Sequence, residues 1–123
     1  KGDEWRSQKT VISLVREYFQ NKPKGLPGND DTGTMSAWLV YTMMGFYPVS
    51  PGDPVYTLTT PMFDKVTIHL DNDFYQGRTI VIKREGSLHD PIKKIYRNGK
   101  IHNSYFISHE ELITCQELKV TTQ

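Results

Sequence analysis

Two adjacent carboxylates, Asp30 and Asp31, are the residues of this chain whose types and spacing could carry out acid–base chemistry. They lie in a loop that spans residues 25–33 and contains three glycines and a proline, a composition typical of turns. The apolar segment that follows, residues 35–44, has the three- and four-residue spacing of a helix. The pair therefore stands at a helix N-terminus, where the helix dipole favours ionised carboxylates.

The residues alone leave two interpretations of this pair open. In the first, Asp31, Thr32 or Thr34 caps the helix, because a side-chain oxygen there can accept from a backbone N–H that lacks a helical partner. A capping aspartate beside a solvated one is the commonest use of such a pair, so the pattern favours this interpretation. In the second, one of the two carboxylates is a catalytic base or a metal ligand.

Other candidate metal sites have weaker support. The run Asp71-Asn72-Asp73 begins like a calcium-binding EF-hand loop, but Tyr75 and Gln76 stand where that loop requires an oxygen ligand and a glycine. We therefore expect a solvated turn at this run. The histidines show no metal-ligand spacing, and we expect each of them to lie on the surface: His69, His89, His102 and His109.

Composition limits the classes of function. A chain of 123 residues is long enough for one small domain with a modest core. Its formal net charge of +1 argues against a nucleic-acid or membrane partner bound by bulk electrostatics, so we expect the basic residues within 93–100 to form a solvated face. All of its apolar runs are shorter than the ~20 residues that span a bilayer. The single cysteine, Cys115, excludes an internal disulfide and a multi-cysteine zinc site.

Hydrophobic periodicity predicts two helices before residue 46. The first, over residues 6–19, is followed by the helix breakers Pro23 and Gly25. The second, over residues 35–44, has Gly45 as its C-cap, and we assign its Met35 and Trp38 to a buried face. The apolar stripe of the first helix consists of Val11, Leu14, Val15, Tyr18 and Phe19.

Beyond the proline-rich segment 47–54, β-branched and aromatic residues dominate. Asn98-Gly99 is a two-residue hairpin signal, and Ser108 with Glu111 has the capping-box spacing of a short helical turn. We therefore predict the fold class α+β, in which a helical hairpin (domain 1–46) precedes an antiparallel β-sandwich-like region (domain 47–123). The predicted strands span residues 55–59, 65–70, 79–83, 92–97, 100–107 and 117–121.

A longer pattern around the acidic pair resembles the C-terminal signature of glycoside hydrolase family 92, a family of calcium-dependent, exo-acting α-mannosidases. The resemblance covers most of the chain and continues through residues 61–68, 98–99 and 104–105. The family usually has a glutamine at the position of Thr34. The resemblance rests chiefly on three blocks: Gly28-Asn29-Asp30-Asp31-x-Gly33-x-Met35-Ser36-Ala37-Trp38, Met44-Gly45-Phe46-Tyr47-Pro48-Val49 and Pro51-Gly52-x-Pro54-x-Tyr56.

This resemblance implies specific roles for residues of the loop. It makes Asp31 the general base of an inverting hydrolysis, with Asp30 as a supporting carboxylate, and it makes Asn29 and Thr34 substrate-binding residues. The implied substrate is a mannose-containing glycan such as an N-glycan, hydrolysed at terminal α-mannosides in the manner of an α-1,2-mannosidase. Ca2+ is the implied cofactor, with most of its ligands outside this chain. The two helices become the last pair of an (α/α)6 barrel.

Family members are several times longer than this chain. The resemblance therefore implies a C-terminal piece of a larger enzyme that is periplasmic, secreted or attached to the cell surface. The rest of that polypeptide would be its partner and would carry the catalytic acid, so we expect no activity from the piece alone. The helix face left uncovered would favour self-association, because large exposed apolar patches drive it.

Two alternatives stay open. The first is a non-catalytic carbohydrate-binding or structural β-module, which the strand-rich second half supports. The second is an (α/α)6-barrel glycosidase or phosphorylase that acts on another sugar. Paired carboxylates count against a phosphorylase, because phosphate would take the place of the base.

Overall fold

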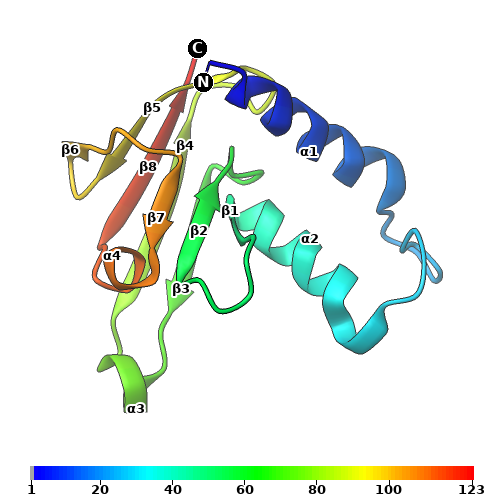
Figure 1. Ribbon diagram of the computed structural model, residues 1–123, viewed down its shortest axis with the longest axis horizontal. Coiled ribbons are helices and arrows are strands. Elements are labelled where there is room, and N and C mark those ends of the chain that lie inside the picture. The colour runs from blue at the N-terminus through cyan, green and yellow to red at the C-terminus, as the bar shows by residue number, and fades with distance from the viewer. Residues whose placement is uncertain (1) are drawn as a thin grey trace.

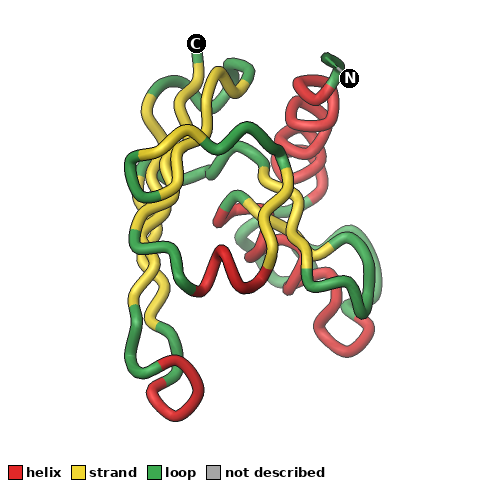
Figure 2. Tube along the Cα trace, turned by 60° about the vertical axis from the view of Figure 1, so that its left-hand side comes forward, coloured by secondary structure: helices red, strands yellow, loops and turns green. Residues whose placement is uncertain are grey.

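The computed structural model describes residues 2–123, which form four α-helices and two β-sheets. The two long helices lie on one side of the sheets, and the smaller sheet lies between them and the larger sheet (Figures 1 and 2). The predicted α+β class is therefore confirmed. The helical part ends where the first strand begins, at Phe46.

The two long helices form near the predicted positions. Helix α1 spans Glu4–Tyr18 and helix α2 spans Thr34–Met44, and residues 19–33 join them. Helix α2 ends at Gly45, as the sequence predicts, with a left-handed φ of 96°. A Cβ at this position would lie 2.7 Å from the Cγ atom of Pro61, so the close approach of these two segments also requires glycine.

Helix α1 buries only part of the predicted stripe. Its buried residues are Gln8, Ile12 and Val15, whereas Leu14 and Tyr18 are 39% and 48% exposed. The apolar surface of this helix is wider than the contact it makes with the rest of the described chain. A stripe inferred from spacing alone therefore includes residues that stay partly exposed here.

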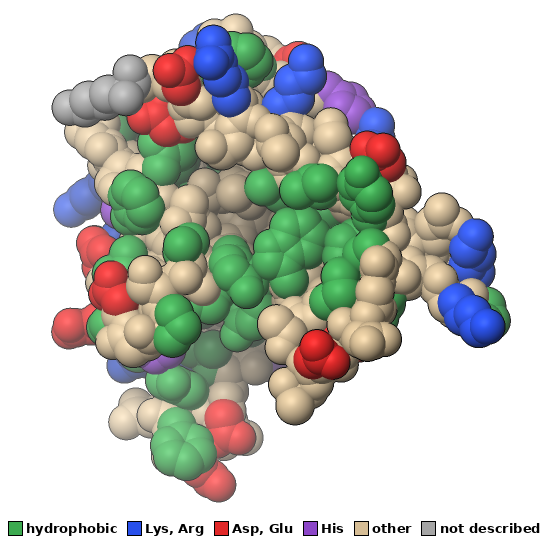
Figure 3. Space-filling model, turned by 45° about the vertical axis from the view of Figure 1, so that its right-hand side comes forward, with side chains coloured by type: hydrophobic (Ala, Val, Ile, Leu, Met, Phe, Trp, Pro, Cys, Tyr) green, Lys and Arg blue, Asp and Glu red, His purple; other side chains and the backbone are tan. Residues whose placement is uncertain are grey.

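Helix α2 is apolar but is poorly covered. Thr42 is its only buried residue, Met35 and Trp38 are half-buried rather than core, and Val40 is 54% exposed. The two helices meet where the rings of Phe19 and Trp38 stack at 5.5 Å between centroids. Hydrophobic side chains gather in the middle of the face seen from the side of the helices (Figure 3). No helix among residues 2–123 combines the length and the apolar character needed to cross a membrane.

The strands form a three-stranded and a five-stranded sheet. The smaller sheet has the order β1-β2-β7, with β1 at Phe46–Pro48, β2 at Val55–Leu58 and β7 at Phe106–Ser108. The larger sheet has the order β3-β4-β8-β5-β6, with β3 at Lys65–His69, β4 at Thr79–Glu85, β8 at Glu117–Thr122, β5 at Ile92–Arg97 and β6 at Lys100–Ile101.

Three expectations about the strands are wrong. The predicted strand 100–107 is two strands in different sheets, because residues 102–105 carry the chain from β6 to β7. Strand β1 lies partly in the proline-rich segment 47–54, where no strand was predicted. The larger sheet is not wholly antiparallel. After α4 the chain enters this sheet beside the start of β4, and β8 therefore runs parallel to β4 and antiparallel to β5.

The apolar core lies in the β-rich region. Every member of its continuous buried cluster comes from residue 46 or later, and Ile82 is fully buried. The hairpin signal is confirmed, because Asn98 and Gly99 both have positive φ and connect β5 to β6. Helix α4, His109–Ile113, begins with the predicted capping box of Ser108 and Glu111.

Candidate active site

The acidic pair lies at the start of a short 3₁₀ turn, η1 (Asp31–Gly33), that leads into α2. Asp30 precedes this turn, and its Oδ1 atom accepts hydrogen bonds from the amides of Met35, at 2.8 Å, and Ser36, at 3.0 Å. Its Oδ2 atom accepts from the Ser36 hydroxyl at 2.5 Å. Asp30 therefore caps α2, and the expectation that Asp31, Thr32 or Thr34 would do so is wrong.

The same hydrogen bonds keep Asp30 ionised. The Ser36 hydroxyl is the main cause that lowers the pKa of Asp30 below its ordinary value of 3.8, and the Ser36 amide is the next. Partial desolvation opposes these bonds, and the Met35 amide adds to them. Asp30 is therefore a fixed anion whose two oxygens are both occupied by donors.

Asp31 has the opposite environment. Its side chain is exposed, and among residues 2–123 its carboxylate makes no hydrogen bond or ion pair. Its backbone carbonyl, in contrast, accepts from the hydroxyls of Thr32 and Thr34, each at 2.7 Å. The main chain of Asp31 is thus held in place while its carboxylate is left available to another group.

Unusual backbone angles produce this division between the two aspartates. Thr32 has a φ of 52° and Gly33 has a φ of 78°, so two consecutive residues are left-handed. A β-branched residue rarely adopts this conformation, which costs on the order of 1–3 kcal/mol and is found mainly at functional sites. Here the left-handed backbone makes residues 31–33 loop out. As a result, Asp30 can cap α2 although its amide donors, Met35 and Ser36, lie five and six residues later in the sequence.

The two other residues assigned to the site flank this turn. Asn29 is exposed, and within the described part of the chain its side chain makes no hydrogen bond. Thr34 is also exposed, but its hydroxyl donates to the Asp31 carbonyl, so only its oxygen lone pairs remain for a ligand. The structure therefore places Asn29, Asp31 and Thr34 within one exposed segment next to Asp30.

A hollow lies beside this turn. It has a volume of about 700 Å³ and is lined by residues 20–26, Gly28 and Ser36. The loop that borders it is compact, because the amide of Gln20 donates to the Gly25 carbonyl at 2.8 Å. A Cβ on Gly25 would lie 1.9 Å from the Gln20 carbonyl oxygen, so this position requires glycine. Ser36 thus lies between the hollow and the Asp30 carboxylate.

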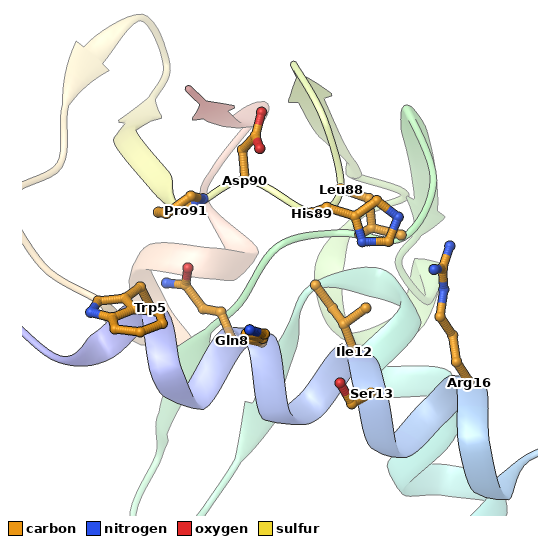
Figure 4. Close-up of a pocket in the computed structure, with 10 residues that line it drawn as sticks. Trp5, Gln8, Ile12, Ser13, Arg16, Leu88, His89, Asp90 and Pro91 are labelled. Carbon is orange, nitrogen blue, oxygen red and sulfur yellow. The ribbon is translucent and has the colours of Figure 1, made fainter.

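A second pocket, of about 370 Å³, lies away from the acidic pair. It is formed by one face of α1 and by residues 88–91 (Figure 4). The Oε1 atom of Gln8 accepts from the amide of Ile92 at 3.2 Å, which joins this helix to the larger sheet. No residue of the segment 29–36 lines this pocket. We therefore interpret it as a packing cleft and not as part of the candidate active site.

The structure also brings together polar residues that the sequence analysis missed. His109 is half-buried, and its two ring nitrogens contact the hydroxyls of Tyr56, at 2.9 Å, and Tyr75, at 3.3 Å. The expectation that every histidine lies on the surface is therefore wrong. Tyr75 belongs to helix α3, Asn72–Tyr75, which forms where a turn was expected and is capped by Asp71. These contacts span 53 and 34 residues, so no local signal could reveal them.

The described residues do not assemble a metal site. Among residues 2–123, no three side chains of His, Cys, Asp or Glu lie close enough together to hold an ion. Ca2+ takes six to eight oxygen ligands. A calcium site would therefore need most of its ligands from outside this chain.

Comparisons with known proteins identify the family to which this chain belongs. The family model described as the glycosyl hydrolase family 92 catalytic domain matches residues 1–123. A solved family 92 α-mannosidase from Bacteroides thetaiotaomicron, in complex with mannoimidazole, is 29% identical with a TM-score of 0.85, over 97% of this chain and 15% of that one. A family 92 inverting mannosidase from the same species is 33% identical with a TM-score of 0.83, over 97% and 16%.

A curated relative gives the same result. A protein from Arthroderma benhamiae named as an uncharacterized secreted glycosidase is 30% identical over 120 residues, which are 94% of this chain and 15% of that protein. The chain thus spans about 15% of the length of its relatives. The family model nevertheless matches the chain from end to end, and the resemblance inferred from the motif blocks is confirmed. The chain belongs to glycosyl hydrolase family 92.

Proposed function

We propose that this chain supplies the general base of an inverting exo-α-mannosidase, and that Asp31 is this base. The observation that carries the proposal is the contrast within the pair, because Asp30 is fixed by three hydrogen bonds while the neighbouring Asp31 carboxylate is exposed. The names of the structural relatives, an α-mannosidase and an inverting mannosidase, support the reaction class.

Inverting hydrolysis needs two carboxyl groups about 6.5–9.5 Å apart, with a water molecule between the base and the sugar. The acid would come from elsewhere in the parent enzyme. Asp31 would accept a proton from the water as that water attacks the anomeric carbon on the face opposite the leaving group. Asp30 is less suited to this step, because both of its oxygens accept hydrogen bonds from α2 and these bonds lower its pKa. Its role would be to fix the turn that carries Asp31. Asn29 and Thr34 would contact sugar hydroxyls.

The proposal extends to the parent enzyme. Helices α1 and α2 would be the last pair of an (α/α)6 barrel, which accounts for the exposed apolar side chains Leu14, Tyr18 and Val40. A bound Ca2+ would contact the sugar, with ligands drawn mainly from the rest of the polypeptide. The substrate would be a glycan with terminal α-mannose, α-1,2-linked residues included. The enzyme would act outside the cytoplasm, as the name of the secreted relative suggests.

The test uses the full-length enzyme and an α-mannoside substrate. Asp31→Asn keeps the shape of the side chain but removes its basicity, so it should lower kcat by ~10²–10⁴-fold. Asp30→Asn should lower kcat less, through orientation alone. Nuclear magnetic resonance of the first product should show β-mannose, which identifies inversion.

Two results would contradict the proposal. Near-normal turnover by Asp31→Asn together with loss of activity in Asp30→Asn would reverse the roles of the pair. Full activity of both variants would leave helix capping as the only function of the loop. The 123-residue chain alone, which lacks a catalytic acid in this proposal, should release no mannose.

A further inference from the structure

Asp30 and Ser36 form a contact that the proposed base does not itself require. Ser36 supplies two of the three donors to Asp30, one from its amide and one from its hydroxyl, and each bonds a different carboxylate oxygen. This two-point contact fixes the rotation of the carboxylate as well as its position. The side chain of an ordinary N-cap residue accepts one hydrogen bond, from the backbone amide two or three residues later in the sequence.

The Asp30–Ser36 contact holds the loop that carries Asp31. The bonds from Met35 and Ser36 close a loop of five to six residues, and Asp31 lies at the start of that loop. The left-handed backbone of Thr32 is unfavourable by itself, so the loop needs external anchors to persist. The anchors include the Asp30 contact, which joins the two ends of the loop, and the threonine hydroxyls that donate to the Asp31 carbonyl near its start.

We propose that Ser36 is a positioning residue of the catalytic site, because its hydroxyl and amide hold Asp30 as the anchor of the turn and thereby fix Asp31 at its exposed position. This inference rests on the proposed function, since it takes Asp31 as the base. It adds that the two carboxylates of the pair have different tasks: Asp30 is an anchoring anion and Asp31 is a proton acceptor. Ser36 makes them different. Without the hydroxyl, Asp30 loses the main cause of its lowered pKa.

The pH dependence distinguishes this role from a purely structural one. If Asp30 takes up a proton, its anchoring bonds weaken and Asp31 is displaced. In the wild type this happens only at low pH, because the pKa of Asp30 is lowered. In Ser36→Ala the anchor should protonate at a higher pH, so the acidic limb of the kcat/KM profile should move upward. A general loosening of α2 would instead lower kcat/KM by the same factor at every pH.

The experiment measures kcat/KM against pH for the full-length enzyme with 4-nitrophenyl α-mannoside. Ser36→Ala should lose about tenfold or more near neutral pH, as expected for a lost hydrogen bond to a charged group, and its acidic limb should shift upward. Ser36→Thr keeps the hydroxyl and should restore both readouts. Ser36→Cys, a near-isosteric weak donor, should be intermediate and serves if the alanine variant does not fold. Ser7→Ala, an exposed serine on α1, is the matched control and should match the wild type.

A double variant completes the test. In the Asp30→Asn background the anchor no longer titrates, so adding Ser36→Ala should cause no further shift of the acidic limb. The inference is overturned if Ser36→Ala leaves the limb unmoved, or if it shifts the limb equally in the Asp30→Asn background. Activity retained by Asp31→Asn would instead overturn the proposed base, whatever the Ser36 variants show, so the two failures are distinguishable.

Discussion

The β-rich region and the helical layer of this chain differ in how completely each buries its own apolar residues. In the β-rich region a continuous cluster is buried between the two sheets, and Ile82 within it is fully buried. In the helical layer, α2 buries only Thr42, and its Val40 is 54% exposed. Helix α1 likewise leaves Leu14 and Tyr18 substantially exposed.

This difference separates the part with its own buried core from the part that carries the proposed catalytic base. The acidic pair lies at the N-terminus of α2, in the layer with fewer internal contacts. The loop compensates locally, through hydrogen bonds to Asp30 and to the Asp31 carbonyl, so the geometry of the pair does not depend on a surrounding core. A catalytic loop built in this way can face a substrate and still keep a defined backbone.

The largest difference in stability should appear between core and helix substitutions. Ile82→Ala removes a fully buried side chain from β4 and should lower the free energy of unfolding of the chain by about 2–5 kcal/mol. Val40→Ala on α2 should change it by less than about 0.5 kcal/mol, because the side chain is mostly exposed. Urea denaturation followed by circular dichroism measures both. Equal losses would show that the helical layer is as tightly packed as the sheets.

A smaller effect should come from two glycines of the helix-connecting loop. Gly25→Ala places a Cβ against the Gln20 carbonyl and should cost about 1–3 kcal/mol through forced backbone movement. Gly28→Ala is the matched control, since its Cβ would make only an ordinary contact with the Met35 sulfur at 3.9 Å. Both tryptophans, Trp5 and Trp38, belong to the helical layer, so fluorescence during denaturation reports on this layer. Indistinguishable midpoints for the two variants would argue against the compact loop.

The smallest predicted effect is the pH dependence contributed by Glu111 in the β-rich region. Hydrogen bonds from the Ser108 amide and then its hydroxyl lower the pKa of Glu111 below its ordinary value of 4.5. A carboxyl with a lowered folded pKa contributes stability that is present above the unfolded pKa and is lost as the pH falls through the folded pKa. As the pH is lowered from about 4.5, the thermal unfolding midpoint of the wild type should therefore decrease more steeply than that of Glu111→Gln. Parallel curves for the two proteins would contradict the role of the capping box.

Local signals in the sequence account for much of the fold. The hairpin at Asn98-Gly99, the capping box of Ser108 and the C-cap at Gly45 were all predictable, because each depends on a few neighbouring residues. The parallel pairing of β4 with β8 was not predictable, since strands alternate in the same way whichever direction their neighbours run. The buried face of α1 was only partly predictable, because a wide apolar stripe does not reveal which part of it meets a neighbour.

The sequence named the residues of the candidate site but not their geometry. The motif pointed to Asp30 and Asp31, yet spacing suggested that Asp31 or a threonine would cap α2. The structure gives that contact to Asp30, because the left-handed Thr32 loops the intervening residues out. No propensity rule places a β-branched residue in that conformation. The importance of Ser36 likewise emerges only when its distance from Asp30 is known.

The central claim, that Asp31 and not Asp30 is the catalytic base, can be tested most directly by chemical rescue of the full-length enzyme. Azide is a small nucleophile that can enter the space left by a missing carboxylate and attack the sugar without a base. With an activated aryl α-mannoside, azide should restore turnover to Asp31→Ala and yield a β-mannosyl azide, whereas Asp30→Ala should gain nothing, because its defect lies in positioning. Rescue of Asp30→Ala alone, with a β-mannosyl azide as product, would contradict the assignment.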